Sequence, residues 1–253
     1  MFSLIKWEIK KNLRPGVLII WALGLALGFK GVFTNFGIEE AYAALFSKYY
    51  LLTVPFMAFA MFTMFSGSFV REYNSNVAGL IKASKNGKQQ LVLAKFIANG
   101  ISASVINLSV FMVMLGRIMS AFKFEGLNWP LKSLWYFGNS GSNITILQMI
   151  LIMIITIILG SFLFAAIGLY LSSLSKRPTM PLILGGLTMG IPYFIVFQGE
   201  KELIFSFLVN GMYSQQLIRY AAPLSYWVAF IGIALILPVV LYKLTKKSFL
   251  KER

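Results

Sequence analysis

Residues 71–95 read REYNSNVAGLIKASKNGKQQLVLAK, a basic and partly helical stretch that lies between two long apolar runs. These runs, 49–69 and 91–115, are each about as long as the roughly 20 residues that an α-helix needs to cross a bilayer. Between two such helices, the water-exposed part of residues 71–95 has to lie at a membrane surface. The stretch therefore predicts a helical membrane protein, and the rest of the chain agrees with that prediction.

The composition points to the same class. Of the 253 residues, 58% are hydrophobic and only 12% are charged, and the mean hydropathy is +0.77. A soluble domain with these values would expose apolar surface through which it would aggregate. The chain is therefore predicted to be one all-α integral membrane domain, residues 1–253, with six transmembrane helices. We place them at 16–32, 49–69, 91–115, 146–174, 180–198 and 222–242.

An even number of spans leaves both termini on one side of the membrane, and the basic residues indicate which side. If the termini are cytoplasmic, 16 of the 23 basic residues fall in inner segments. This bias fits the positive-inside rule, and the net charge of +15 meets anionic lipid headgroups rather than nucleic acid. A cleaved signal peptide with an apolar region at 17–28 is the alternative, but its charged leader is long and Pro15 interrupts it. We expect a multi-pass protein of a bacterial cell membrane with both termini in the cytoplasm.

Several kinds of chemistry are excluded because the chain contains no His, no Cys and no Asp. A nucleophilic triad needs an imidazole base, and a zinc site needs His, Cys or carboxylate ligands. None of the eight Glu residues lies in the apolar core of a predicted span, which argues against proton-coupled transport. The string Asn86-Gly87-Lys88-Gln89 lacks the first Gly and the hydroxyl of a phosphate-binding loop. We predict no catalytic residue, cofactor or metal in this chain, so any energy has to come from a partner.

The N-terminal residues 1–14 are predicted to form an amphipathic helix on the inner membrane surface. Phe2, Ile5, Ile9 and Leu13 share one face at helical spacing, and basic residues surround them. Pro15 disfavours helical geometry at the residue before it and suits the first turn of the next helix. The chain is therefore expected to bend there into the first span.

Residues 71–90 are expected to contain a short cytoplasmic helix. Ser75 is a suitable N-cap, Lys82 and Lys85 suit the negative C-terminal end, and Asn86-Gly87 ends the pattern. The apolar face of this helix would consist of Val77, Leu80 and Ile81. The alternative is a solvated basic loop that only sets the topology.

This layout resembles the permease subunit of ABC-2 type ATP-binding cassette exporters. The matching residues are Glu72 at the end of span two, Gly79-Leu80, the turn from Ser84 to Lys88, and Lys95 in span three. Many such permeases have a Gly-Thr pair after the acid and a Pro before the Ser-basic turn. This chain has Val77-Ala78-Gly79 and Lys82-Ala83-Ser84 instead.

The resemblance implies that residues 1–14 are a connecting helix and 71–90 a coupling helix, both in contact with a separate ATPase subunit. That subunit would bind ATP and Mg²⁺ and drive a pair of permeases between inward-open and outward-open states. The short loop 173–179 would be a second contact. The implied docking residues are Glu72, Val77, Gly79, Leu80, Ile81, Lys82, Ser84, Lys85 and Lys88.

Other residues of the spans suggest packing contacts and a substrate path. Gly24 with Gly28, and Gly186 with Gly190, are pairs of small residues that allow close helix approach, either within the chain or across a permease dimer. In the resembling family, spans one and five meet at the dimer interface. Span two carries a soft apolar stripe that either lines a substrate path or is lipid-facing or packed. Its residues are Met57, Met61, Met64 and Phe65.

Two outer segments complete the pattern. Residues 116–145 contain Trp129-Pro130 and Trp135-Tyr136, which are typical of an interfacial belt. Residues 199–221 have an apolar middle, 203–209, that is too short to cross. It resembles the re-entrant outer helices of such exporters, and a simple surface helix is the alternative.

The sequence therefore predicts a permease subunit, as a homodimer or with a sister permease, that exports a hydrophobic or amphipathic cargo. A path rich in Met and Phe without buried charge favours a peptide such as a bacteriocin, an antimicrobial peptide or a toxin. Two other classes remain open. One is a membrane sensor or assembly factor that transports nothing, and the other is an intramembrane lipid-modifying enzyme.

Overall fold

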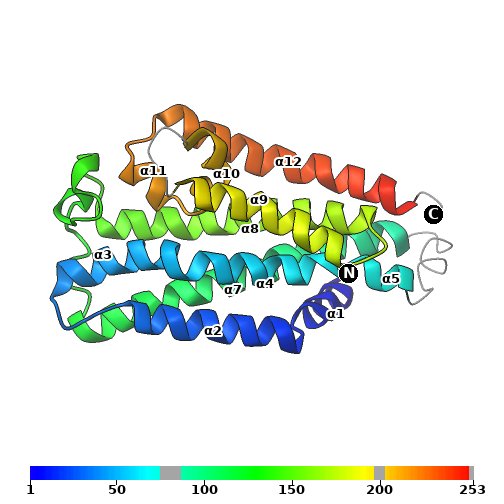
Figure 1. Ribbon diagram of the computed structural model, residues 1–253, viewed down its shortest axis with the longest axis horizontal. Coiled ribbons are helices and arrows are strands. Elements are labelled where there is room, and N and C mark those ends of the chain that lie inside the picture. The colour runs from blue at the N-terminus through cyan, green and yellow to red at the C-terminus, as the bar shows by residue number, and fades with distance from the viewer. Residues whose placement is uncertain (75–86, 197–202, 251–253) are drawn as a thin grey trace.

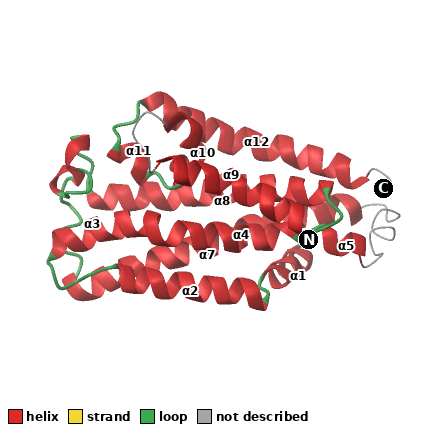
Figure 2. Cartoon of the chain, viewed as in Figure 1, coloured by secondary structure: helices red, strands yellow, loops and turns green. Residues whose placement is uncertain are grey.

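The chain is helical throughout the part that the computed structural model describes, which is residues 1–74, 87–196 and 203–250. Long helices run side by side along one axis, and the first and last described residues lie at the same end of the bundle (Figure 1). In Figure 2 the described chain is almost entirely helix, joined by short loops. Apart from one isolated bridge between Pro130 and Thr145, these residues show no β-pairing.

A proline bend separates the first two helices. Helix α1 (Phe2–Asn12) meets α2 (Pro15–Gly31) at an angle of 73°. Arg14 has extended backbone angles and Pro15 occupies the first position of α2, as the restriction on the residue before proline requires. The bend that the sequence predicts is therefore present.

The second long helix begins earlier than expected. We predicted a span over 49–69, but the helix starts with α3 (Ile38–Lys48) and continues through η1 (Tyr49–Thr53), α4 (Val54–Ser66) and α5 (Val70–Asn74). η1 is a π-helical turn, a feature that is often found at functional sites. Glu39, Glu40 and Lys48 gave this segment the appearance of a loop. In the structure α3 buries the six consecutive apolar residues 41–46.

Four further helices complete the main bundle. They are α7 (Gly87–Phe122), α8 (Ile146–Leu174), α9 (Thr179–Val196) and α12 (Leu224–Leu250). Helix α8 is central, since it packs against α4, α7, α9, α10 and α12. Its start is fixed by a capping box in which Thr145 and Gln148 exchange hydrogen bonds.

Several helices are long and apolar enough to cross a membrane. Four qualify by themselves within the described residues, and the bent α1–α2 pair is a fifth if it counts as one span. Residues 179–194 of α9 form a shorter apolar helix. Large apolar side chains point outward along α2, α9 and α12, for example Ile19, Ile183 and Leu235. These features indicate a multi-pass membrane protein.

The outer segments fold against the end of the bundle opposite the termini. The connection between α7 and α8 contains the short helices η2 (Leu131–Ser133) and η3 (Gly138–Ser140). Helices α10 (Leu203–Met212) and α11 (Gln215–Arg219) precede α12. Helix α10 packs against α8, α9 and α12 and buries Val209 and Met212.

Candidate functional site

Four charged side chains from three separate helices meet at the end of the bundle that holds the termini. Lys95 Nζ of α7 lies 2.8 Å from Glu8 Oε2 of α1 and 2.9 Å from Glu72 Oε1 of α5. Lys11 Nζ of α1 lies 2.8 Å from Glu8 Oε1 and 3.2 Å from Glu72 Oε1. We call Glu8, Lys11, Glu72 and Lys95 the charge junction. Each lysine contacts both glutamates, so the two charges of each sign form one network.

Most of the charge junction is buried. The exposed fraction of the side chain is 1% for Lys95, 3% for Glu8 and 10% for Glu72, whereas Lys11 keeps 39%. A buried charge is very costly unless it is paired and hydrogen-bonded. The close pairing of opposite charges therefore explains how these groups can lie inside a largely apolar bundle.

Neighbouring polar groups extend the charge junction along α7. Asn12 at the end of α1 donates a hydrogen bond to Ser102 Oγ at 3.2 Å. Asn99 donates to the carbonyl of Lys95 at 2.7 Å and accepts from Ser68 Oγ at 3.4 Å. These bonds fasten α1 and the end of α4 to the same face of α7.

Arg71 and Phe69 link the charge junction to other elements. Arg71 donates from Nη1 to the carbonyl of Lys11 at 3.2 Å and from Nε to the carbonyl of Gly67 at 3.0 Å. The Lys95 ammonium lies 5.6 Å from the centre of the Phe69 ring, which packs at 5.1 Å against Phe249 of α12. The N-terminal helix, the end of span two, the start of α7 and the end of α12 are therefore joined in one place.

A cleft of about 450 Å³ opens beside the charge junction. Lys11, Arg71, Glu72 and Asn74 line it. Asn74 is the last described residue before the predicted coupling helix. The cleft is thus lined by one lysine and one glutamate of the network, next to the last described residue of this segment.

Only part of the predicted docking surface can be placed. Glu72 lies in the charge junction, and Lys88 belongs to the first turn of α7. The remaining docking residues lie outside the described residues. They are Val77, Gly79, Leu80, Ile81, Lys82, Ser84 and Lys85.

The residues predicted to line a substrate path lie in the closed core of the chain. Met57, Met61, Met64 and Phe65 are all fully buried. Met61 accepts a hydrogen bond through sulfur from Asn107 Nδ2 at 3.2 Å. In this conformation they pack against neighbouring helices. The sequence allowed such packing as the alternative to a role in lining a substrate path.

The glycine pairs separate into two kinds. A Cβ on Gly24 would come within 2.2 Å of Met57 Cε, and one on Gly28 within 3.0 Å of Val110, so this pair serves packing within the chain. Gly186 and Gly190 on α9 have nothing within 4 Å of a Cβ. Of the two pairs, only the one on α9 leaves room for a second permease.

Helix α1 turns its polar side inward. Glu8 and Asn12 are buried against α7, whereas Phe2 and Trp7 are 90% and 62% exposed. An apolar side that faces away from the protein suits a helix at a lipid surface. Of the predicted apolar face, Phe2 and Leu13 are exposed whereas Ile5 and Ile9 are half-buried, and the inward side carries half of the charge junction.

The pairing of the charge junction was not predicted from the sequence, which treated its members as separate cytoplasmic charges. Lys95 offered a signal, since an ionisable residue inside an apolar helix usually has a partner. Glu8 is 87 positions away along the chain, so no local pattern identifies it as that partner.

Comparisons with known proteins identify neither a family nor a function for this chain. No protein-family model matches the chain, and neither a curated protein nor a solved structure matches it. The resemblance to ABC-2 permeases therefore rests on the layout of the sequence. Among the described residues, no group of three or more acidic, His or Cys side chains is arranged to hold a metal ion.

Proposed function

We propose that this chain is the membrane-spanning permease subunit of an ATP-driven exporter, with both termini in the cytoplasm of a bacterium and six spans. The observation that carries the proposal is the charge junction. It ties the N-terminal helix and the end of span two to the first turns of α7. Glu72 precedes residues 75–86 in the chain, and Lys95 follows them. A force applied to that segment by a partner would reach three helices through one cluster.

The mechanism follows from the rigidity of this connection. Lys95 and Glu8 are held at 2.8 Å in a buried environment, where breaking the pair would leave an uncompensated charge. The helices therefore move together rather than slide past one another. The partner ATPase binds and hydrolyses ATP with Mg²⁺. The permease converts the movement of that ATPase into a change between inward-open and outward-open states.

The cargo we propose is a hydrophobic or amphipathic peptide, such as a bacteriocin, an antimicrobial peptide or a toxin. The residues of span two that would meet it, Met61 and Phe65 among them, are soft and apolar and can repack around different partners. We propose that a second permease packs against α9, where the space beside Gly186 and Gly190 would allow close approach.

The test is to copurify the chain with candidate ATPase subunits, reconstitute the complex in liposomes, and measure ATP hydrolysis with and without candidate peptides. We expect cargo-stimulated hydrolysis that Glu72→Gln abolishes. The matched control is Glu39→Gln, which changes an exposed glutamate at the opposite end of the bundle.

Two results would overturn the proposal. If no ATPase subunit binds the chain, a sensor or assembly factor is the better assignment. If the purified chain modifies lipids without nucleotide, it is an enzyme.

A further inference from the structure

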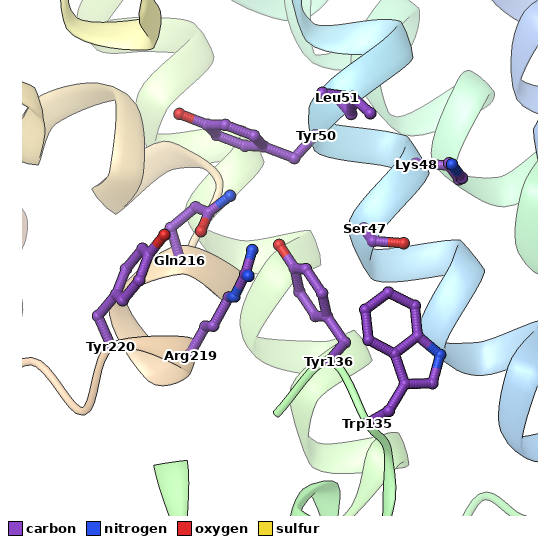
Figure 3. A pocket seen from close by; sticks show the side chains of 9 residues that line it. All are labelled: Ser47, Lys48, Tyr50, Leu51, Trp135, Tyr136, Gln216, Arg219 and Tyr220. Atoms are coloured by element: carbon purple, nitrogen blue, oxygen red, sulfur yellow. The ribbon is translucent and has the colours of Figure 1, made fainter. Parts of the chain in front are cut away.

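A pocket of about 340 Å³ lies near the end of the bundle opposite the charge junction. Its walls come from the junction of α3 with η1, from the connection between α7 and α8, and from α11 and the residue that follows it (Figure 3). With the termini in the cytoplasm, this end faces outward. The volume is at the lower end of the range for small-molecule sites.

The charges that line the pocket are all positive. Arg219 and Lys48 both contribute to its wall, and no described carboxylate does. Neither cation forms a salt bridge with a carboxylate in the described part of the chain, where the ion pairs are those of the charge junction. Arg219 instead lies 4.5 Å from the centre of the Tyr136 ring and 5.4 Å from that of Tyr220. A guanidinium has five N–H donors, so Arg219 can bind an anion in addition to its contacts with the two tyrosines.

Two polar groups in the wall are buried, and within the described residues neither forms a well-aligned hydrogen bond. They are the hydroxyl of Tyr136, a residue that is 5% exposed, and the side-chain carbonyl of Gln216, which is 3% exposed. The Tyr136 hydroxyl nevertheless lies close to the side chains of Arg219 and Gln216. Figure 3 shows both side chains and Arg219 pointing toward one another across the pocket. Buried polar groups nearly always have partners, so a ligand that supplies an acceptor and a donor would complete this wall.

The protonation of Tyr136 fits a role as donor. Burial raises the pKa of its phenol to about 12, against the lowering effect of the Arg219 guanidinium. The hydroxyl therefore keeps its proton at neutral pH. It can donate to a ligand oxygen while its ring supports the guanidinium.

The surrounding wall is fixed in place. Trp135 donates from Nε1 to Glu40 Oε2 at 3.0 Å, and Tyr50 donates to Asn210 Oδ1 at 3.2 Å. The carbonyl of Leu51, within the π-helical turn, accepts from the Tyr193 hydroxyl at 2.8 Å. Preorganised walls lower the cost of binding because fewer side chains have to be ordered by the ligand.

We propose that this pocket binds the phosphate of an amphipathic molecule with a hydroxyl-bearing headgroup, of which glycerol phosphate is the simplest form. Arg219 and Lys48 neutralise the phosphate, Tyr136 donates to one of its oxygens, and the Gln216 carbonyl accepts from a headgroup hydroxyl. Trp135 and Tyr220 are side chains of the kind that lie at the headgroup level of a bilayer. The proposal does not depend on the assignment of the chain as an exporter subunit.

The test uses the full chain in neutral detergent and isothermal titration calorimetry. The probes are short-chain phosphatidylglycerol, free glycerol phosphate, and short-chain phosphatidylcholine as a lipid without headgroup hydroxyls. We expect saturable binding of phosphatidylglycerol that Arg219→Gln weakens by at least about tenfold, because hydrogen bonds to charged groups are the strong ones. Tyr136→Phe keeps the ring under Arg219 and should weaken binding by about fivefold.

The matched control is Lys132→Gln, which removes an exposed cation of the same connection that does not line the pocket. Arg219-dependent binding of glycerol phosphate would identify a soluble phosphate compound as a source of the ligand. Arg219-dependent binding of phosphatidylglycerol alone would identify a membrane lipid. Equal affinities for the Arg219→Gln and Lys132→Gln proteins would overturn the proposal, and so would the absence of saturable binding of both phosphatidylglycerol and glycerol phosphate.

Discussion

The two ends of the bundle handle buried polar groups in opposite ways. At the end with the termini, Lys95 and Glu8 lie 2.8 Å apart and share a network in which each lysine contacts both glutamates. At the other end, Arg219 rests on aromatic rings, and the Tyr136 hydroxyl and the Gln216 carbonyl form no well-aligned hydrogen bond within the described residues. The first arrangement is complete within the chain and holds helices together. The second, as we propose, is completed by a bound ligand.

We expect the two ends of the bundle to face opposite sides of the membrane, and labelling can test this in an all-or-none manner. The chain contains no cysteine, so single cysteines can be introduced at the exposed positions Ser3 and Ser133. We expect a membrane-impermeant maleimide to label the Ser133→Cys protein in intact cells and the Ser3→Cys protein only after lysis. Labelling of both proteins in intact cells would show that the two ends lie on the same side of the membrane.

The largest loss of stability is expected when the most buried cation is removed from the charge junction. Lys95→Met leaves two buried glutamates with only Lys11, and we expect the free energy of unfolding to fall by about 3–5 kcal/mol. Lys11→Met is the matched control because Lys11 has the same partners but is 39% exposed, so its loss should cost about 1 kcal/mol or less. Denaturant titration in detergent measures both. Equal losses would contradict the claim that burial gives Lys95 its importance.

Neutralising the cluster should reverse most of that loss. In the triple variant Glu8→Gln, Glu72→Gln and Lys95→Met, no buried charge is left without a partner. Replacement of a whole buried ion network is often neutral or stabilising. We expect the triple variant to regain most of the stability that Lys95→Met loses, as measured by the same titration. A triple variant that is no more stable than Lys95→Met would show that the loss does not come from buried glutamates left without a partner.

The sequence was informative where the cause of structure is local. The apolar run at 146–174 coincides with α8, because the run is long and Thr145 caps its start. The bend at Pro15 follows from restrictions on two neighbouring residues. Helix α3 was missed because Glu39 and Glu40 suggest a loop, whereas its stability comes from the buried face at 41–46 packing against other helices.

The two polar sites depend on contacts between distant segments. Glu8 and Lys95 are 87 positions apart, and Arg219 meets a tyrosine that lies in another connection. Periodicity cannot pair such residues. The presence of Lys95 within an apolar helix was the one local sign that a partner had to exist.

The most direct test of the difference between the two ends is to compare Lys95→Met with Arg219→Gln by thermal unfolding, with and without short-chain phosphatidylglycerol. A ligand that binds only the folded chain raises the unfolding temperature. We predict that Lys95→Met lowers the unfolding temperature but keeps the rise with ligand. Arg219→Gln should nearly keep the unfolding temperature and lose the rise. If Arg219→Gln destabilised the chain as much as Lys95→Met and still gave the full rise with ligand, the account of the two ends would be wrong.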